Sequence, residues 1–367
     1  MPPVHYQPDG FPPEDRLDWR RLIPLIGPAA AAVARYDSLL RTVPSAHATL
    51  AALPVQEAVS SSRIENIFTS VTEVLETDAG LEPANPYSLA DANEVLNYLA
   101  AERRAAEMLP EKPLSLRVIR EAHGRLLAGD RGHGKSPGKF RRSPVWIGGP
   151  GSTLETATFV PAPAEQVPDR MSAWERHVNA DSPDRLVQVA VQHAEFEAVH
   201  PFLDGNGRLG RMLIPLLMRQ YGLIGAPVFS ISRQIAPRRI FYYDALLGVS
   251  RDDDCTGWCL YLLDAIRAQA QEGAATIRTM LDLRAEVESH LARRTRARLV
   301  DTALDRLFAN PVFRASEFAA AGGIPSRTAR RMLSRLRDKG VLEEAVPAKG
   351  RRSSVLRFPR LLEAVAG

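Results

Sequence analysis

The sequence predicts a mainly α-helical chain with one short β-hairpin and a C-terminal winged helix-turn-helix domain. Apolar residues recur at helical spacing over most of the first 300 residues, for example within residues 209–217. Residues 130–165 break this pattern, because they are rich in glycine, proline and β-branched residues. The last block, residues 297–367, reads as three short helices followed by two short strands. At 367 residues, the chain is long enough for two or three domains.

Residues 1–109 are expected to form an N-terminal helical region. Proline-rich sequence fills its first twenty residues, and helical spacing follows until the break at "LEPANPYS". A long amphipathic helix is then expected over residues 88–109, with Ser88 as its N-cap. The apolar run at 22–34 is too short to span a bilayer. We therefore expect no membrane anchor and no signal peptide in this run.

Residues 110–275 are expected to form the core of the molecule. Within it, "SPVWIGG" and "TATFVPAP" flank a Gly-Pro-Gly turn, which predicts a short hairpin. Helical spacing returns after this hairpin and continues to about residue 300. The only two cysteines, Cys255 and Cys259, share one face of a helix and are expected to be buried structural residues. Such low cysteine use favours a reducing, cytoplasmic location.

A charged helical connector, residues 276–296, is expected to lead into the winged helix-turn-helix domain of residues 297–367. Residues 291–361 hold 17 Lys/Arg and 6 Asp/Glu, whereas the whole chain carries a net charge of only +4. The helix that starts at Ser326 presents several arginines around an apolar stripe, as a recognition helix would. The turn at residues 349–352 is also basic. DNA is therefore a candidate partner of this domain, although many winged helices bind protein or only pack.

The segment "HPFLDGNGRLGR", residues 200–211, carries the strongest chemical signal. Gly205, Asn206 and Gly207 lead directly into a helix, so successive backbone N–H groups form an anion nest at its N-terminus. Two glycines let a phosphate approach the backbone closely. Arg208 and Arg211 add planar forks that suit phosphate oxygens.

Two further residues of this segment supply the chemistry. Asp204 can hold a Mg²⁺ ion that bridges phosphate oxygens. His200 has an ordinary pKa near neutrality, so it can take a proton from an attacking hydroxyl. A histidine before proline or a Gly-Asn-Gly turn alone would usually be structural. Together, these residues predict a site that binds a nucleotide polyphosphate with its metal and transfers part of it to an alcohol.

The same segment resembles the signature of the Fic family, His-Pro-Phe-x-Asp/Glu-Gly-Asn-Gly-Arg-x-x-Arg, at every defined position. "FRRSPVWIGG", "FEAVHPF" and "RRIFYYDALLGV" resemble the flap, the central helix and the nucleotide side of that family. The resemblance covers most of residues 29–270. It implies a Fic-type helical bundle in which the predicted hairpin is the flap.

The resemblance implies transfer of AMP from ATP to a Ser, Thr or Tyr hydroxyl of a target protein. His200 would deprotonate the hydroxyl, whose oxygen attacks the α-phosphate while Mg²⁺-pyrophosphate leaves. Asp204 would bind the metal. The Gly205–Gly207 nest would hold the α- and β-phosphates, with Arg208 on the β side and Arg211 on the γ-phosphate.

Other contacts also follow from the resemblance. The flap, with Val145, Trp146, Ile147 and Gly148, would pair with the target's backbone as an added strand. Tyr242 and Tyr243 would lie near the adenine or ribose, with simple packing as the alternative. Ser250 is also counted among the ATP-binding residues, and it stands where relatives often have Arg or Asn.

A second, smaller motif lies in "SSSRIENIFTS", residues 60–70. Taken alone, it reads as a helix start in which Ser61 or Ser62 is the cap and Glu65 completes a capping box. It also resembles the family's inhibitory motif, Ser/Thr-x-x-x-Glu-Gly/Asn, through Ser61, Glu65 and Asn66. This implies that Glu65 pairs with Arg211 in the place of the γ-phosphate and inhibits the enzyme.

Several alternatives stay open at this point. A Fic enzyme could transfer another phospho-group or remove AMP. The chain could instead be a DNA-binding regulator whose Fic domain acts as a sensor. Self-modification and a homodimer are further expectations that the residues do not decide.

Overall fold

The computed structural model describes residues 2–7, 11–81, 85–109, 113–132, 134–292, 295–320, 323–350 and 352–367. It is mainly helical, as the sequence predicts. The chain divides into two compact units. The first comprises residues 1–37, 60–66 and 97–271, and the second comprises residues 38–59, 67–96 and 272–367. Four helices contribute residues to both units: α1 (Trp19–Thr42), α3 (Leu53–Ile64), α5 (Pro86–Met108) and α12 (Cys255–Ala292).

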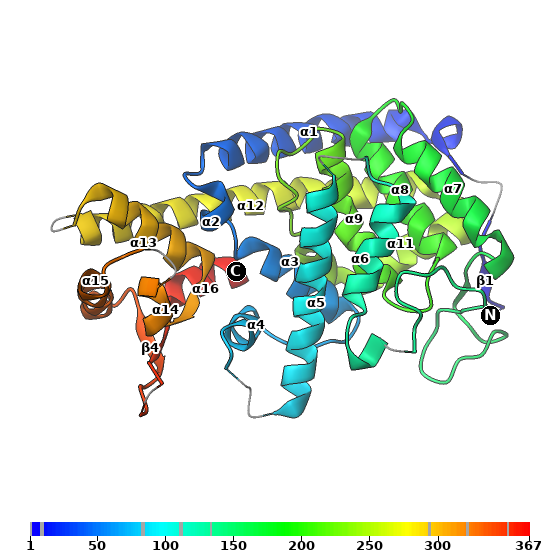
Figure 1. Ribbon diagram of the computed structural model, residues 1–367. Coiled ribbons are helices and arrows are strands. Elements are labelled where there is room, and N and C mark those ends of the chain that lie inside the picture. The colour runs from blue at the N-terminus through cyan, green and yellow to red at the C-terminus, as the bar shows by residue number, and fades with distance from the viewer. Residues whose placement is uncertain are drawn as a thin grey trace. The chain divides into compact units, whose positions relative to one another are not determined.

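The first unit is a helical bundle built around α8 and α9. Its other helical elements are η2 (Glu14–Arg16), α6 (Leu116–Leu126), η3 (Asp130–Gly132), η4 (Ala164–Gln166), α7 (Val167–Val178), α8 (Arg185–Val199), α9 (Asn206–Gln220), α10 (Ser232–Ile235), η5 (Ala236–Arg238) and α11 (Arg239–Asp252). Helix α8 packs against α7, α9 and α11, and α9 also packs against α6 (Figure 1). Most residues of α8 and α9 are buried, so these two helices form the centre of this unit.

The only strands described in this unit are β1 (Val4–His5) and β2 (Phe159–Val160), which pair in parallel. The sequence predicts a hairpin over this region, but the structure joins its two arms by a single antiparallel bridge, between Ile147 and Phe159. In this register Pro161 opposes Val145, and because Pro161 lacks a backbone N–H, the ladder cannot continue on that side of the bridge. The arms meet at this one bridge, and the segment between them is a loop.

The second unit contains a C-terminal block of helices and a small sheet. Its elements are α2 (Ala46–Thr49), α4 (Val71–Asp78), α13 (Ala297–Ala309), β3 (Val312–Arg314), α14 (Ala315–Ala320), α15 (Ser326–Asp338), β4 (Glu343–Val346), β5 (Val355–Arg357) and α16 (Pro359–Ala366). The sheet is antiparallel with the order β3-β5-β4. The three predicted helices and two predicted strands are present, and β3 and α16 are additional. Arg351 of the predicted basic turn lies outside the described residues.

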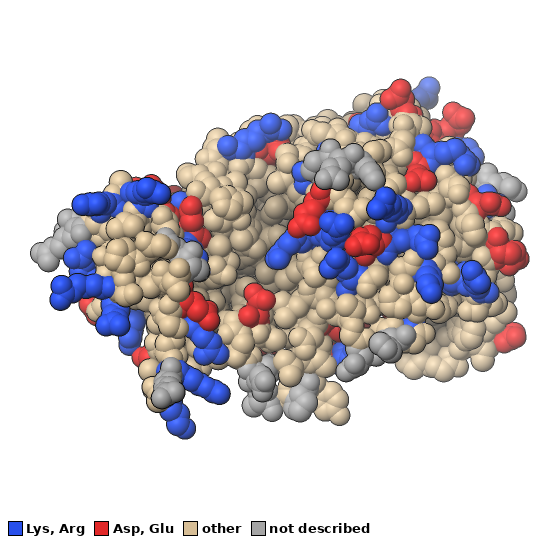
Figure 2. Space-filling view, viewed as in Figure 1, with Lys and Arg blue, Asp and Glu red and all other residues tan. Residues whose placement is uncertain are grey.

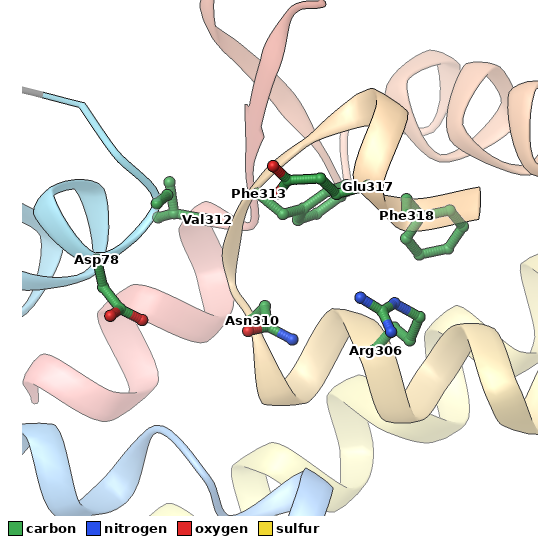
Figure 3. A pocket seen from close by; sticks show the side chains of 8 residues that line it. Asp78, Arg306, Asn310, Val312, Phe313, Glu317 and Phe318 are labelled. Carbon is green, nitrogen blue, oxygen red and sulfur yellow. The ribbon is translucent and has the colours of Figure 1, made fainter. Parts of the chain in front are cut away.

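A small cavity of about 110 Å³ lies among α4, α13, β3 and α14 (Figure 3). Its polar wall includes Asp78, Arg306, Asn310 and Glu317, and its apolar wall includes Phe318. A nucleotide-sized ligand needs roughly 300 Å³ or more. This cavity is therefore too small for the nucleotide that the sequence predicts, and it marks the seam where α4 packs on β3.

Two further expectations can be compared with the structure. Cys255 and Cys259 are buried free thiols, as expected. No helix within the described ranges has a stretch both long and apolar enough to cross a bilayer.

Candidate active site

The motif of residues 200–211 joins the two central helices of the first unit. Asp184 caps the start of α8, where its Oδ1 accepts two backbone N–H groups at 2.9 Å. Helix α8 ends at His200, whose left-handed backbone (φ +50°) and following Pro201 turn the chain away. Gly205, with φ +75°, then starts α9 in a conformation that favours glycine. The sequence thus places a sharp loop between two rigid, buried helices.

Asn206 holds this loop in shape with its side chain. Its Oδ1 accepts the Phe202 N–H at 2.9 Å, and its Nδ2 donates to the Phe202 carbonyl at 2.9 Å. Both Asn206 and Phe202 are buried. Both polar atoms of the Asn206 side chain therefore bind the loop itself, so this residue would meet an anion through its backbone.

The first turn of α9, which begins at Asn206, presents N–H groups that have no acceptor inside the helix. Together with the helix dipole, they favour an anion at this end. A Cβ at Gly207 would lie 2.3 Å from Glu65 Oε1 and 3.0 Å from Arg211 Nη1. A carboxylate oxygen of the chain itself thus lies over this turn, where an oxygen of a bound phosphate would be expected.

Arg211 is fully buried and is held by the segment that contains the smaller motif. Its Nη2 donates to Glu65 Oε1 at 2.7 Å and to the Ser61 carbonyl at 3.0 Å. Its Nε donates to Ser61 Oγ, also at 3.0 Å. The structure therefore brings together the two side chains, Glu65 and Arg211, that the resemblance pairs.

The alternative interpretation of this motif as a helix start is wrong. Ser61 and Ser62 lie in the last turn of α3, and Glu65 follows the end of that helix. The capping box of this region is formed instead by Ser70 and Glu73 at the start of α4. Short Ser-x-x-Glu spacings occur in both places, so spacing alone does not separate a helix start from a helix end.

Asn66 fixes the chain directly after Glu65. Its backbone is left-handed (φ +61°), a conformation that asparagine tolerates better than most residues. Its Oδ1 accepts a hydrogen bond from Arg239 Nη1 at 3.0 Å. This contact ties the segment that carries Glu65 to the start of α11.

The His200 ring is oriented by a backbone carbonyl. Its Nδ1 lies 3.2 Å from the Glu197 carbonyl oxygen, and because a carbonyl only accepts, Nδ1 carries the proton. Burial lowers the pKa of the His200 imidazole to about 4. The ring is therefore neutral at pH 7, and the lone pair of Nε2 can accept a proton.

Asp204 is half-buried at the mouth of the motif. Its Oδ1 accepts the Gly205 N–H at 2.6 Å, and its Oδ2 lies 3.9 Å from Lys135 Nζ. No group of three or more His, Cys, Asp or Glu side chains with metal-binding geometry occurs in the described part of the chain. A lone carboxylate fits Mg²⁺, which commonly takes one or two carboxylates and completes its shell with phosphates and water.

Arg141 was not predicted as a site residue, but it holds the end of α8. Its Nε donates to the His200 carbonyl at 2.7 Å, and its Nη2 donates to the carbonyls of Val199, at 3.1 Å, and Ala162. Its backbone N–H donates to the Pro201 carbonyl at 2.9 Å. This one buried arginine therefore satisfies two of the carbonyl groups that the end of α8 leaves open, those of Val199 and His200. Its place in "FRRSPVW", beside the flap, is the only signal that the sequence offers.

His123 on α6 was also missed. It stacks on Phe202, with ring centroids 3.7 Å apart, and accepts the Gly138 N–H on Nδ1 at 2.8 Å. Nε2 therefore carries the proton and donates to the Asp204 carbonyl at 3.0 Å. Burial lowers the pKa of His123 to about 4, so this contact persists at neutral pH. Its place on the apolar face of an amphipathic helix gave the sequence no reason to single it out.

The residues predicted on α11 differ in their surroundings. Tyr242 is buried, its hydroxyl lies 2.8 Å from His193 Nε2, and its ring packs against Trp258. Tyr243 is 43% exposed, and burial of its hydroxyl raises its pKa to about 12. Ser250 is buried. Tyr243 is thus the residue of this set that a ligand could reach, whereas Tyr242 belongs to an aromatic cluster.

The flap residues lie on an exposed loop. Ile147 exchanges backbone hydrogen bonds with Phe159, at 2.9 and 3.0 Å. Trp146 is 44% exposed, and its indole N–H donates to the Ser152 carbonyl at 2.9 Å. Val145 is half-buried, and Gly148 is exposed. The loop is fixed at Ile147 and open to solvent on either side.

Comparison with known proteins gives two family models and several relatives. The model "Fic/DOC family N-terminal" matches residues 23–107, and the model "Fic/DOC family" matches residues 113–218. Protein adenylyltransferase Fic of Drosophila grimshawi is 30% identical over 225 residues, which are 56% of this chain and 42% of the relative. The Culex quinquefasciatus protein of the same name is 29% identical over 250 residues, 63% of this chain and 45% of the relative. The match thus spans less than half the length of each relative.

Solved structures of similar fold agree with these matches. A Fic family protein from Desulfovibrio desulfuricans G20 superposes with a TM-score of 0.59 at 20% identity, over 92% of this chain and 95% of the other. Fic-1 of C. elegans gives a TM-score of 0.53 at 22% identity, over 71% and 76%. At such identities, these likenesses concern the fold alone. The longer of the two matched segments, residues 113–218, contains the complete motif of residues 200–211. The chain therefore belongs to the Fic/DOC family.

Proposed function

We propose that this chain is a protein adenylyltransferase, which transfers AMP from ATP to a Ser, Thr or Tyr hydroxyl of a target protein, and that Glu65 inhibits it. The supporting observation is the position of the Glu65 carboxylate. It lies over the first turn of α9 and pairs with the buried Arg211 at 2.7 Å. A site that binds an anion through a helix N-terminus and a guanidinium is suited to a phosphate. The names of the insect relatives agree with this reaction.

In the proposed reaction, Nε2 of His200 takes the proton of the target hydroxyl. The hydroxyl oxygen forms a bond to the α-phosphorus of ATP, and the bond from that phosphorus to the bridging oxygen breaks, so that pyrophosphate leaves. Arg211 and the first turn of α9 hold the phosphates. Arg208, a buried residue of the same turn, supports the β-phosphate. Asp204 would hold Mg²⁺, which neutralises charge on the phosphates when it is bound.

Inhibition follows from competition for one guanidinium. The Glu65 carboxylate and a γ-phosphate cannot both occupy the same donor of Arg211. Ser61 binds two nitrogens of the same guanidinium and thereby fixes its orientation toward Glu65. ATP would bind productively only when residues 61–66 move away.

The proposed target contact is backbone pairing along the exposed flap at Val145–Gly148. Addition of a strand gives affinity through main-chain hydrogen bonds and demands little sequence. Trp146 offers an exposed apolar ring next to that edge.

The proposal can be tested with ATP labelled at its α-phosphorus. Glu65→Gly should raise labelling of the chain itself or of lysate proteins about tenfold or more, because the competing carboxylate is removed. His200→Ala in the same background should abolish labelling. Glu363→Gly, a matched loss of an exposed glutamate on α16, should leave labelling at the wild-type level.

Two results would overturn the proposal. Equal labelling by the wild-type and Glu65→Gly proteins would remove the inhibitory role. Label transfer that survives His200→Ala would remove the base. Mass spectrometry of the product distinguishes AMP from phosphate, which have different masses, and so tests the alternative of another transferred group.

We also propose that residues 297–367 form a winged helix-turn-helix domain. Support comes from the order α13-β3-α14-α15-β4-β5, in which three helices alternate with a three-stranded antiparallel sheet. Helices α14 and α15 pack against each other, and α15 is the third helix of the set, the position of a recognition helix.

A further inference from the structure

We infer that the surface formed by α15 and the β4–β5 hairpin binds double-stranded DNA, with α15 entering the major groove. This rests on the winged helix-turn-helix assignment proposed above, and it is independent of AMP transfer. The partner is identified by three properties of the surface: its charge, its lack of apolar area and its shape.

Helix α15 separates an apolar face from a basic face. Ala329, Met332, Leu333 and Leu336 are buried against the rest of the unit. Arg327 and Arg330 lie outside this face and are exposed, and Asp338 at the C-terminal end is the only acidic residue of the helix. The helix therefore presents arginines, which suit phosphate oxygens and the O6 and N7 atoms of guanine.

The hairpin adds to the same charge. Its two acidic residues are already paired with arginines. Glu344 accepts a 2.9 Å hydrogen bond from Arg337, and Glu343 accepts one from Arg357. The turn is closed by two backbone hydrogen bonds between Lys349 and Arg352, at 3.1 and 3.0 Å. Both side chains are exposed. Figure 2 shows Lys and Arg gathered over α15 and the hairpin.

A protein partner fits this surface less well than a polyanion. The centre of a protein interface is usually apolar. Among the described residues of 297–367, Val346 is the only large apolar side chain that is exposed. Attraction to this surface must therefore come from charge, as in binding to a phosphate backbone.

The shape of the surface favours B-form DNA over an RNA duplex. Helix α15 has 13 residues, which gives a length of about 20 Å. The major groove of B-DNA is about 12 Å wide and admits such a helix. The major groove of A-form RNA is deep and too narrow. Insertion of α15 therefore predicts preference for DNA, whereas attraction by charge alone would not distinguish the two.

The test uses the full chain and fluorescence anisotropy of a labelled, random-sequence DNA duplex of about 24 base pairs. We expect binding in about 50 mM NaCl that weakens on the order of 100-fold by about 200 mM, as for roughly four phosphate contacts. Arg327→Glu/Arg330→Glu should weaken binding at least about tenfold. Arg103→Glu/Arg117→Glu changes the net charge equally on exposed arginines of α5 and α6, and it should change binding less than about twofold.

A second variant guards against misfolding of the first. Lys349→Glu/Arg352→Glu alters only the hairpin turn and should also weaken binding, with an unchanged thermal melt. The His200→Ala protein should bind DNA like the wild type, so a failed adenylylation assay would leave this inference untouched. The inference is overturned by absence of binding in low salt, by equal losses in the surface and control variants, or by equally strong competition from an RNA duplex of the same length.

Discussion

The Nε atom of Arg141 donates a 2.7 Å hydrogen bond to the carbonyl oxygen of His200, the proposed base. The same guanidinium also holds the Val199 carbonyl. Arg141 thus positions the base through backbone carbonyl groups. Arg141→Lys keeps the charge but loses the planar fork. We expect it to lower kcat for AMP transfer about tenfold or more in the Glu65→Gly background, with little change in the KM for ATP. The control, Arg142→Lys, alters the exposed neighbour and should have no such effect. An equal loss in both variants, or a change confined to KM, would contradict this role.

Asn206→Ala should destabilise the chain and abolish most activity. The substitution removes two hydrogen bonds of 2.9 Å to a buried backbone, which costs about 2 kcal/mol of unfolding free energy. Urea unfolding followed by circular dichroism measures this change. Asn179→Ala removes a 2.9 Å hydrogen bond that Nδ2 donates to the Glu175 carbonyl and a 3.4 Å hydrogen bond that Oδ1 accepts from Gln220. Both are exposed at the end of α7, so this substitution should cost clearly less. A smaller loss for Asn206→Ala than for Asn179→Ala would contradict the structural role.

Gly207→Ala tests whether the Glu65 carboxylate and a phosphate of ATP use the same place at the α9 N-terminus. In the wild-type chain, the added Cβ would lie 2.3 Å from Glu65 Oε1, so the glutamate must move. The same methyl group would block the approach of a phosphate. We therefore expect weaker ATP binding, about tenfold or more, in both the wild-type and Glu65→Gly backgrounds, measured by calorimetry. Gly27→Ala, on α1, meets no atom within 4 Å and serves as the control. Tighter ATP binding by Gly207→Ala would show that the phosphates bind elsewhere.

The pH dependence of stability should depend partly on Glu195. Burial raises the pKa of this carboxyl to about 7, and Tyr6 donates a 2.6 Å hydrogen bond to it. The folded chain therefore keeps a proton that the unfolded chain loses above about pH 4.5, so stability falls as the pH rises toward 7. Glu195→Gln should reduce this fall by about 2.5 kcal/mol, measured by urea unfolding from pH 5 to 8. Glu165→Gln, at an exposed position, should leave the slope unchanged. An unchanged slope in Glu195→Gln would contradict the assignment.

The local sequence was sufficient to predict the site at residues 200–211, because the turn, the anion nest and the helix follow one another directly in the chain. It was not sufficient for Arg141 and His123, which reach the motif only through tertiary packing. The pairing of Glu65 with Arg211 came from family resemblance, since the spacing Ser-x-x-Glu of Ser62 and Glu65 favours a helix start and the structure has a helix end there. The hairpin was predicted from turn residues, but the structure has a single bridge there, and Pro161 prevents its extension on one side. Strand β3 was missed because three residues carry too little periodicity.

Glu65 and Arg211 belong to one compact unit of one chain. An inhibitor tethered in this way acts at a fixed effective concentration, which dilution of the protein does not change. Inhibition of this kind would be equally strong at low and at high protein concentration. Relief of inhibition would then require a change in residues 60–66 themselves, such as binding of this segment by a partner or a covalent modification within it.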